Sequence, residues 1–271
     1  MSHRFFLSQT PTEDIARLEG DEARHLARVM RAKTGDTVEL FDGQGTSWPA
    51  TVVNIERDHV TLSLGHKHSE RSPDKPALTL AVALPKGDRQ KWLIEKITEL
   101  GTDSLVPLTT TRSVAEPTAA AMSRLQRGVI ESCKQSGRNR LLKITPPQSL
   151  HNLLTTSSAS LRILACPDGN PMQSILSKPI DNLLIVIGPE GGFTDEEIST
   201  AQAYGFQKMS LCQNILRIET AAVAAAVIAG QCKYALSALL FTARPLINLR
   251  LLSLLSIQVL WATAPDIVTN A

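Results

Sequence analysis

The stretch Leu183-Leu-Ile-Val-Ile-Gly-Pro-Glu-Gly-Gly-Phe-Thr-Asp-Glu-Glu197 joins three structural signals in one short segment. Leu183 to Ile187 predicts a buried strand. A tight glycine-rich turn follows, and Thr194 and Glu197 have the spacing of a capping box at a helix start. In open α/β sheets, ligands bind beyond the carboxyl ends of strands. The segment therefore predicts a ligand-binding loop at residues 188–192, with an ordinary turn as the alternative.

The chain after residue 77 alternates between strand and helix patterns. Strands are expected at 78–84, 105–108, 161–165, 183–187 and 208–211, and helices at 88–100, 119–136, 195–204 and 219–233. Asp88 is the expected N-cap of the first helix, with Leu93, Ile97 and Leu100 as its buried stripe. The alternation predicts an α/β fold with a mostly parallel sheet and helices on both faces.

The N-terminal part has a different pattern. Strand-like runs at 37–41, 51–55 and 60–64 surround one expected helix at 21–32, which predicts a small β-barrel or meander. Residues 66–77 are polar and contain two prolines, so they are the expected linker. The predicted domains are 1–70 and 76–235. An almost uncharged segment follows at 236–271, where an extra packed helix or interface segment is favoured over a membrane anchor.

Composition narrows the class of protein. The 271 residues carry a net charge of only +2, so the distribution of charge matters more than its total. The four cysteines form no C-x-x-C pair and the histidines lack zinc-like spacing, which predicts reduced thiols and no metal site. The N-terminus lacks the apolar region of a signal peptide, and we expect a cytoplasmic protein without a membrane segment.

Two basic clusters suggest nucleic acid. Arg24, Arg28 and Arg31 recur at helical spacing, with Leu26, Val29 and Met30 expected on the opposite side, and Arg4 and Lys33 could extend this patch. A second cluster follows the helix end at Gly137 and comprises Lys134, Arg138, Arg140 and Lys143. A solvated helix face and cations that complement a helix dipole are the alternatives.

Arg217 precedes the last expected helix, where a cation is unfavourable. It therefore calls for a partner such as Glu190 or Glu219, or for a ligand carboxylate or phosphate. The sequence contains no Ser-His-Asp order and no paired-carboxylate motif. A transferase that binds a small cofactor on loops and RNA on a basic surface fits these residues better than a hydrolase.

A series of motifs in this order resembles the RsmE family, the 16S ribosomal RNA uracil N3-methyltransferases of the SPOUT superfamily. The motifs are Arg4-Phe-Phe, His25-Leu-Ala-Arg-Val-Met-Arg31, Gly35-Asp36, Asp42-Gly43, Lys86-Gly-Asp-Arg89, Glu95-Lys-Ile-Thr-Glu-Leu-Gly101, Glu131-Ser-Cys-Lys-Gln-Ser-Gly-Arg-Asn-Arg140, Ile187-Gly-Pro-Glu-Gly-Gly-Phe193 and Ile215-Leu-Arg-Ile-Glu-Thr-Ala221. The chain departs from the family at Cys212, Gln213 and Asn214, and its segment from Leu236 on has no family counterpart.

The resemblance implies an N-terminal PUA-like RNA-binding barrel, a knotted SPOUT methyltransferase domain, a homodimer and S-adenosylmethionine bound in the knot. The implied cofactor-binding residues are Leu164, Gly188, Pro189, Glu190, Gly191, Gly192, Leu211, Ile215, Leu216 and Arg217. The implied RNA-binding residues are Arg4, Arg24, Arg28, Arg31, Lys86, Arg89, Lys134, Arg138 and Arg140.

The implied reaction is methylation of uridine N3 in 16S ribosomal RNA of the small ribosomal subunit. We expect Arg138 or Arg217 to stabilise charge on a uracil oxygen, with Glu190 orienting one of them or accepting the proton. Two rival functions are a non-catalytic RNA-binding assembly factor and a SPOUT methyltransferase that acts on transfer RNA. An intact loop at residues 188–192 argues against the first rival, because a pure binder has no need of it.

Overall fold

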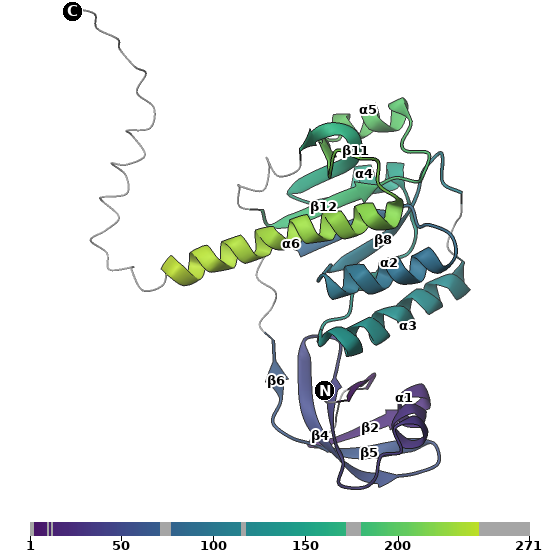
Figure 1. Ribbon diagram of the computed structural model, residues 1–271, viewed down its shortest axis with the longest axis vertical. Helices are drawn as coiled ribbons and strands as arrows, with labels where there is room; N and C mark the ends of the chain where they lie inside the picture. Colours follow the sequence, from purple (N-terminus) through teal and green to yellow (C-terminus); the bar gives the residue numbers. More distant parts are fainter. Residues whose placement is uncertain are drawn as a thin grey trace, which may run out of the picture. The chain divides into compact units, whose positions relative to one another are not determined.

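The computed structural model describes residues 3–9, 11, 13–70, 77–114, 118–171 and 180–243, with side chains as far as residue 230. Its contacts divide the chain into Met1–Lys233 and Tyr234–Ala271, and the first unit holds both sheets (Figure 1). The second half of the predicted linker, residues 71–76, and most of the apolar segment 236–271 lie outside the described residues.

The N-terminal sheet has the strand order β1-β3-β4-β5-β2, with β6 paired to β4. Its strands are β1 (Arg4–Phe6), β2 (Ile15–Glu19), β3 (Thr37–Phe41), β4 (Thr46–Ile55), β5 (His59–Leu64) and β6 (His68–Ser69). The three strands expected from sequence are confirmed, although β4 begins earlier, at Thr46. Alternate residues face a core that contains Phe5, Leu18 and Leu62.

The linker prediction is wrong for residues 68–70, because these residues bond to the N-terminal domain. His68 and Ser69 pair with β4, and the Glu70 amide donates to the Gly45 carbonyl at 2.8 Å. The polar composition of this stretch reflects a solvent-exposed edge strand rather than a connection.

The N-terminal helix is also shorter than predicted. It consists of α1 (Gly20–Arg24) and a π-helical turn, η1 (His25–Val29). A π turn carries more residues per turn than an α-helix, so side chains after it rotate out of the expected stripe. Val29 is therefore 68% exposed instead of buried, and Arg31 lies beyond the helix with a φ of 54°.

The second sheet has the order β10-β8-β7-β12-β11-β13, with β9 paired to β8, and every pair is parallel. Its strands are β7 (Ala77–Val82), β8 (Ser104–Thr109), β9 (Lys143–Ile144), β10 (Gln148–Ser149), β11 (Leu161–Pro171), β12 (Asn182–Ile187) and β13 (Gln207–Ser210). This confirms the predicted parallel sheet, and the short β9 and β10 are additions that the sequence pattern did not indicate.

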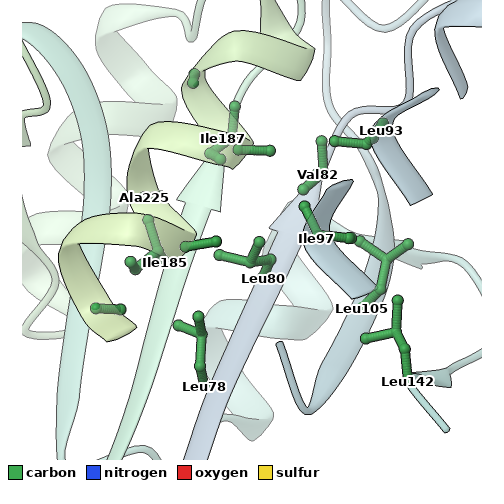
Figure 2. Close-up of a cluster of buried hydrophobic side chains, with 14 of the residues drawn as sticks. Leu78, Leu80, Val82, Leu93, Ile97, Leu105, Leu142, Ile185, Ile187 and Ala225 are labelled. Atoms are coloured by element: carbon green, nitrogen blue, oxygen red, sulfur yellow. The ribbon is translucent and has the colours of Figure 1, made fainter. Parts of the chain in front are cut away.

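Helices cover both faces of this sheet, as expected (Figure 1). Alternation along the strands sends Leu80 and Ile185 to one face, where Figure 2 shows them packed with Leu93 and Ala225, and sends Ala81 and Val186 to the other. The first face holds α2 (Asp88–Glu99), α3 (Ala119–Ser136) and α6 (Ile218–Ala243), and the second holds α4 (Leu150–Thr156) and α5 (Asp195–Ala203).

Two details of the predicted helix at 88–100 are corrected. Gly87, with a φ of 67°, is the N-cap, and Asp88 is the first helical residue. Leu100 is 37% exposed, while Ile94 is fully buried beside Leu93 and Ile97. The buried face of α2 therefore consists of Leu93, Ile94, Ile97 and Thr98, and it ends before Leu100.

The barrel and the parallel-sheet domain share a buried polar contact centred on Arg4. The Arg4 guanidinium donates to the Cys133 carbonyl at 2.9 Å and to the Asn139 amide oxygen, and its Nε lies 3.3 Å from the Glu39 carboxylate. The guanidinium also stacks over the Phe41 ring at 4.8 Å. Only 7% of the Arg4 side chain is exposed. Arg4 therefore joins β1 and β3 to the C-terminal end of α3.

We predict that Arg4→Ala lowers the free energy of unfolding by about 2–4 kcal/mol, because the Cys133 carbonyl and the Asn139 amide oxygen lose a charged donor at a buried junction. Urea denaturation measures this change. Arg24→Ala is the matched control, since the Arg24–Asp21 pair is 62% and 80% exposed and should contribute at most about 1 kcal/mol. Equal losses in the two variants would contradict the role assigned to Arg4.

Candidate functional site

A cavity of about 380 Å³ lies at the carboxyl ends of β11 and β12, within the usual range for small-molecule sites. Three segments form its walls: residues 165–168 after the regular part of β11, residues 187–193 after β12, and residues 210–218 between β13 and α6. Apolar side chains such as Ile187, Leu211 and Leu216 form much of its lining, with backbone groups and a few polar side chains between them.

Glycine is required in the loop after β12 for steric reasons. A Cβ on Gly188 would lie 3.0 Å from the Phe193 ring, and one on Gly191 would lie 3.3 Å from Arg112 Cδ. Gly192 has a φ of 67°, in the left-handed region that side chains disfavour. Residues 188–192 line the cavity, and of the three glycines only Gly192 has the positive φ expected of them.

A second loop, which follows β8, holds this glycine loop from outside. Arg112 Nη1 donates to the Gly191 carbonyl at 2.7 Å and to the Phe193 carbonyl at 3.3 Å. The Thr111 amide donates to the Glu197 carboxylate at 2.8 Å. Sequence reasoning missed Arg112, because no spacing rule links it to a loop so distant in the chain.

The predicted capping box at α5 is present, with Thr194 Oγ1 accepting from the Glu197 amide at 3.1 Å and Glu197 accepting from the Thr194 amide at 2.8 Å. Burial disfavours the charged Glu197 carboxylate, but hydrogen bonds from the Thr111 and Thr194 amides outweigh it. They hold the pKa of Glu197 below its ordinary value.

Two cysteines line the cavity. Burial raises the pKa of Cys166 to about 11, so its thiol stays neutral at physiological pH. Cys212 is exposed at the rim, where the chain departs from the family pattern. The neutral thiol of Cys166 therefore adds no charge to that wall, whose one carboxylate is Asp168.

Most of the predicted cofactor-binding residues lie together on this cavity. They are Gly188, Pro189, Glu190, Gly191, Gly192, Leu211, Ile215 and Leu216. The resemblance also implies a wall at residues 164–167. Ala165 to Pro167 line the cavity together with Asp168, whereas strand alternation places Leu164 in the core on the other face of the sheet. Arg217 is also absent from the lining and is exposed.

Glu190 pairs with an arginine that differs from the two proposed from sequence. Arg89 Nη2 lies 3.2 Å from the Glu190 carboxylate, and Arg89 Nη1 lies 3.8 Å from the Glu219 carboxylate. Both expected partners of Arg217 are therefore engaged by Arg89. Within the described part of the chain, the Arg217 guanidinium makes no recorded ion pair or hydrogen bond.

Arg138 lies at the opposite edge of the sheet from the cavity. Its guanidinium donates to the Thr98 carbonyl at 2.9 Å and to the Thr102 carbonyl at 2.7 Å, between the end of α2 and the amino end of β8. Burial lowers the pKa of Arg138, yet an arginine remains charged there. In this chain Arg138 satisfies backbone carbonyls at the C-terminal end of α2. It is not among the residues that line the cavity, whereas the sequence led us to expect that it contacts uracil.

Two other cations of the second basic cluster, Lys134 and Arg140, are also engaged within the protein, whereas Lys143 is exposed. Lys134, 10% exposed, pairs with Glu22 at 2.9 Å, and Arg140 packs against Gly45 and donates to the Glu70 carbonyl at 3.5 Å. With Arg4, they join the two domains instead of forming a free phosphate-binding edge. The predicted RNA-binding side chains that remain accessible are Arg24, Arg28, Arg31, Lys86 and, in part, Arg89.

A search of the described residues finds no group of histidine, cysteine, aspartate and glutamate side chains suited to a metal ion. None of the helices described there has the length and apolar character needed to cross a bilayer.

Residues 72–230 match the family described as RNA methyltransferase domain, and residues 18–65 match the family described as RNA methyltransferase PUA domain. Relatives named ribosomal RNA small subunit methyltransferase E include one from Synechocystis sp., 35% identical over 74% of this chain and 67% of the relative. Another, from Rickettsia conorii, is 33% identical over 77% of this chain and 86% of the relative.

Solved structures agree with these matches. A putative methyltransferase from Legionella pneumophila in complex with the cofactor SAM has a TM-score of 0.79 at 25% identity, and covers 85% of this chain and 98% of its own. A ribosomal RNA small subunit methyltransferase E from Neisseria gonorrhoeae, bound to S-adenosyl methionine, has a TM-score of 0.77 at 28% identity, over 83% and 95%.

A barrel of this kind joined to a parallel sheet with a glycine-built cavity defines an RNA methyltransferase of the knotted SPOUT class with a PUA-like domain, which confirms the expected fold class. The extent of the matches then fixes the family. The chain belongs to the ribosomal RNA small subunit methyltransferase E family, as its motifs indicated.

We predict that Arg138→Ala lowers the free energy of unfolding by about 2–4 kcal/mol, because two buried carbonyls lose charged donors. Arg124→Ala, an exposed change on α3, should stay within about 0.5 kcal/mol. Chemical denaturation gives both values. A stable Arg138→Ala protein that binds cofactor but transfers no methyl group would instead restore the catalytic interpretation of Arg138.

We predict that Glu197→Gln lowers the free energy of unfolding by about 1 kcal/mol at pH 7. Because the folded pKa is depressed, the carboxylate's contribution is present above the unfolded value of about 4.3 and is lost as pH falls through the folded value. The difference between the two proteins should therefore shrink below about pH 4. Glu196→Gln, on the same helix turn, is the control, and a pH-independent difference would contradict the prediction.

Proposed function

We propose that this protein transfers a methyl group from S-adenosylmethionine to N3 of a uridine in 16S ribosomal RNA of the small ribosomal subunit. We further propose that it acts in the cytoplasm as a homodimer. The observation that carries the proposal is the cavity built on Gly188 to Gly192. Two similar solved structures are of proteins with this cofactor bound.

The residues present fit such a cofactor. A Cβ on Gly188 or Gly191 would make a tight contact with Phe193 or Arg112, and the loop backbone itself lines the cavity. The walls at 165–168 and 210–218 enclose the rest, with apolar side chains suited to a ring system and backbone groups suited to polar atoms. When bound, S-adenosylmethionine supplies an electrophilic methyl group on its sulfonium, which uracil N3 takes as it loses its proton.

The chain's own residues have two tasks in this reaction. Glu190, 48% exposed and held by Arg89, accepts the N3 proton and passes it to solvent. Arg217 is exposed, has no ion pair or side-chain hydrogen bond within the described residues, and supplies a cation for the RNA phosphate. Arg28 and Arg31 on the barrel are accessible for phosphate contacts farther along the RNA.

The decisive experiment measures methyl transfer from labelled S-adenosylmethionine to small ribosomal subunits that lack the modification, followed by mass spectrometry of the nucleosides. A 3-methyluridine product in 16S RNA is expected. Transfer to transfer RNA alone would support the rival methyltransferase. Absence of both transfer and cofactor binding would support a non-catalytic assembly factor.

We predict that Gly191→Val weakens S-adenosylmethionine binding at least about tenfold, since its side chain would displace Arg112 and distort the loop. Titration calorimetry measures the affinity. Gly230→Ala is the control, because a Cβ there meets nothing within 4 Å. Unchanged affinity in Gly191→Val would argue against the loop as the cofactor site.

A further inference from the structure

A second cavity adjoins the cofactor cavity and shares two wall residues with it. It has a volume of about 230 Å³, and its walls include Pro189 and Glu190, which also line the first cavity. The remaining lining residues are Ala83, Leu84, Lys86, Arg89, Ser113 and Val114. A water molecule occupies about 30 Å³ of the liquid, so a cavity of this volume has room for a single small ring with polar substituents.

Arg89 is fixed in this cavity by two carboxylates. It lies between Glu190, at 3.2 Å, and Glu219, at 3.8 Å. The Glu219 side chain is only 10% exposed, and its Oε2 has no hydrogen-bond partner, so the ion pair with Arg89 is its compensation. The guanidinium is thereby held in place before any ligand arrives.

Lys86 contributes a second cation of a different kind. It is exposed, and no ion pair or hydrogen bond is recorded for its ammonium group within the described residues. The cavity thus offers two donors, Lys86 and Arg89, and one acceptor, the Glu190 carboxylate. Leu84, Val114 and Pro189 supply apolar surface, and Val114 is 66% exposed although it is a large aliphatic residue.

We propose that this cavity receives the unstacked uracil ring of the target nucleotide and selects uracil over cytosine. This inference rests on the proposed methylation of uridine. The edge of uracil presents O4, N3–H and O2, which are an acceptor, a donor and an acceptor. Glu190 accepts from N3–H, while Lys86 and Arg89 donate to the two oxygens, so the three side chains match the edge group by group.

The same arrangement rejects cytosine. Cytosine presents an N3 lone pair to the Glu190 carboxylate and an amino donor to one of the cations, which leaves two unfavourable contacts. Cytosine N3 carries a free lone pair and is intrinsically the better nucleophile, so the discrimination must come from the site. The two cations also stabilise the negative charge that spreads onto the uracil oxygens as N3 loses its proton.

The position of the cavity supports this assignment. A base bound there meets the cofactor cavity across Pro189 and Glu190, the wall that both cavities share. The loop after β8 provides Ser113 and Val114 to this cavity and, through Arg112, holds the Gly191 carbonyl. One loop therefore contacts both the proposed base site and the cofactor loop.

The test uses the full-length protein and small subunits reconstituted from transcribed 16S RNA with uridine or cytidine at the methylated position. Wild-type enzyme is expected to prefer uridine by at least about 100-fold in kcat/KM. Lys86→Ala should reduce kcat/KM for the uridine substrate about ten- to 100-fold while the Kd for S-adenosylmethionine changes less than about twofold. Lys91→Ala, which changes an exposed lysine on α2, the helix that follows Lys86, is the control and should change neither quantity.

Two further variants keep the test decisive. Arg89→Lys retains a cation near Glu219, so the variant should fold. Its kcat/KM should fall, because a lysine ammonium lacks the planar guanidinium whose several N–H groups can contact two carboxylates and a base together. Glu190→Gln replaces an acceptor by a group that can also donate to cytosine N3, so the preference for uridine should fall at least about tenfold. Thermal unfolding checks that each variant is folded.

The outcomes separate the two proposals. If wild-type enzyme forms no 3-methyluridine, the proposed function fails and this inference fails with it. If wild-type enzyme forms 3-methyluridine but Lys86→Ala and Arg89→Lys retain full kcat/KM, only the proposed base site is refuted. The same conclusion follows if Glu190→Gln retains the full preference for uridine. A parallel loss of S-adenosylmethionine affinity in Lys86→Ala would assign the cavity to the cofactor and overturn the inference.

Discussion

The parallel pairing of β12 between β7 and β11 is the constraint on which the site depends. Its five apolar residues, Leu183 to Ile187, are buried from both faces, which holds the strand rigidly in register with both neighbours. All three strands end at the same edge, so the loops after them must meet there. The glycine loop can approach a ligand closely because the strand that carries it cannot shift.

Much of the positive charge that suggested an RNA surface is used inside the protein. Arg4 and Lys134 join the barrel to α3, and Arg138 donates to the carbonyls between α2 and β8. A buried guanidinium is stable only when its donors are satisfied, and these sites satisfy them with carbonyls and carboxylates.

The Glu219–Arg89–Glu190 series links this structural use of charge to the proposed chemistry. Glu219 is nearly buried at the start of α6, and Arg89 extends from α2 to neutralise it. The same guanidinium holds Glu190 at the wall between two cavities. Preorganised groups of this kind are effective because they need no rearrangement when charge develops on a substrate. The arrangement joins helix packing, loop position and the proposed recognition of uracil.

The sequence by itself determined the parallel α/β domain, the capping box at Thr194 and the glycine loop, because strand period, caps and turns depend on residues close together in the chain. It also identified the family through its motifs. It could not place Arg217, Arg138 and Leu164 relative to the cavity. It also could not identify Arg112 as a residue that holds the glycine loop. These positions depend on contacts between distant segments or on which face of the sheet a strand residue occupies. Only the tertiary structure paired Arg89 with Glu190, since that pairing arises when α2 and the β12 loop meet across the sheet.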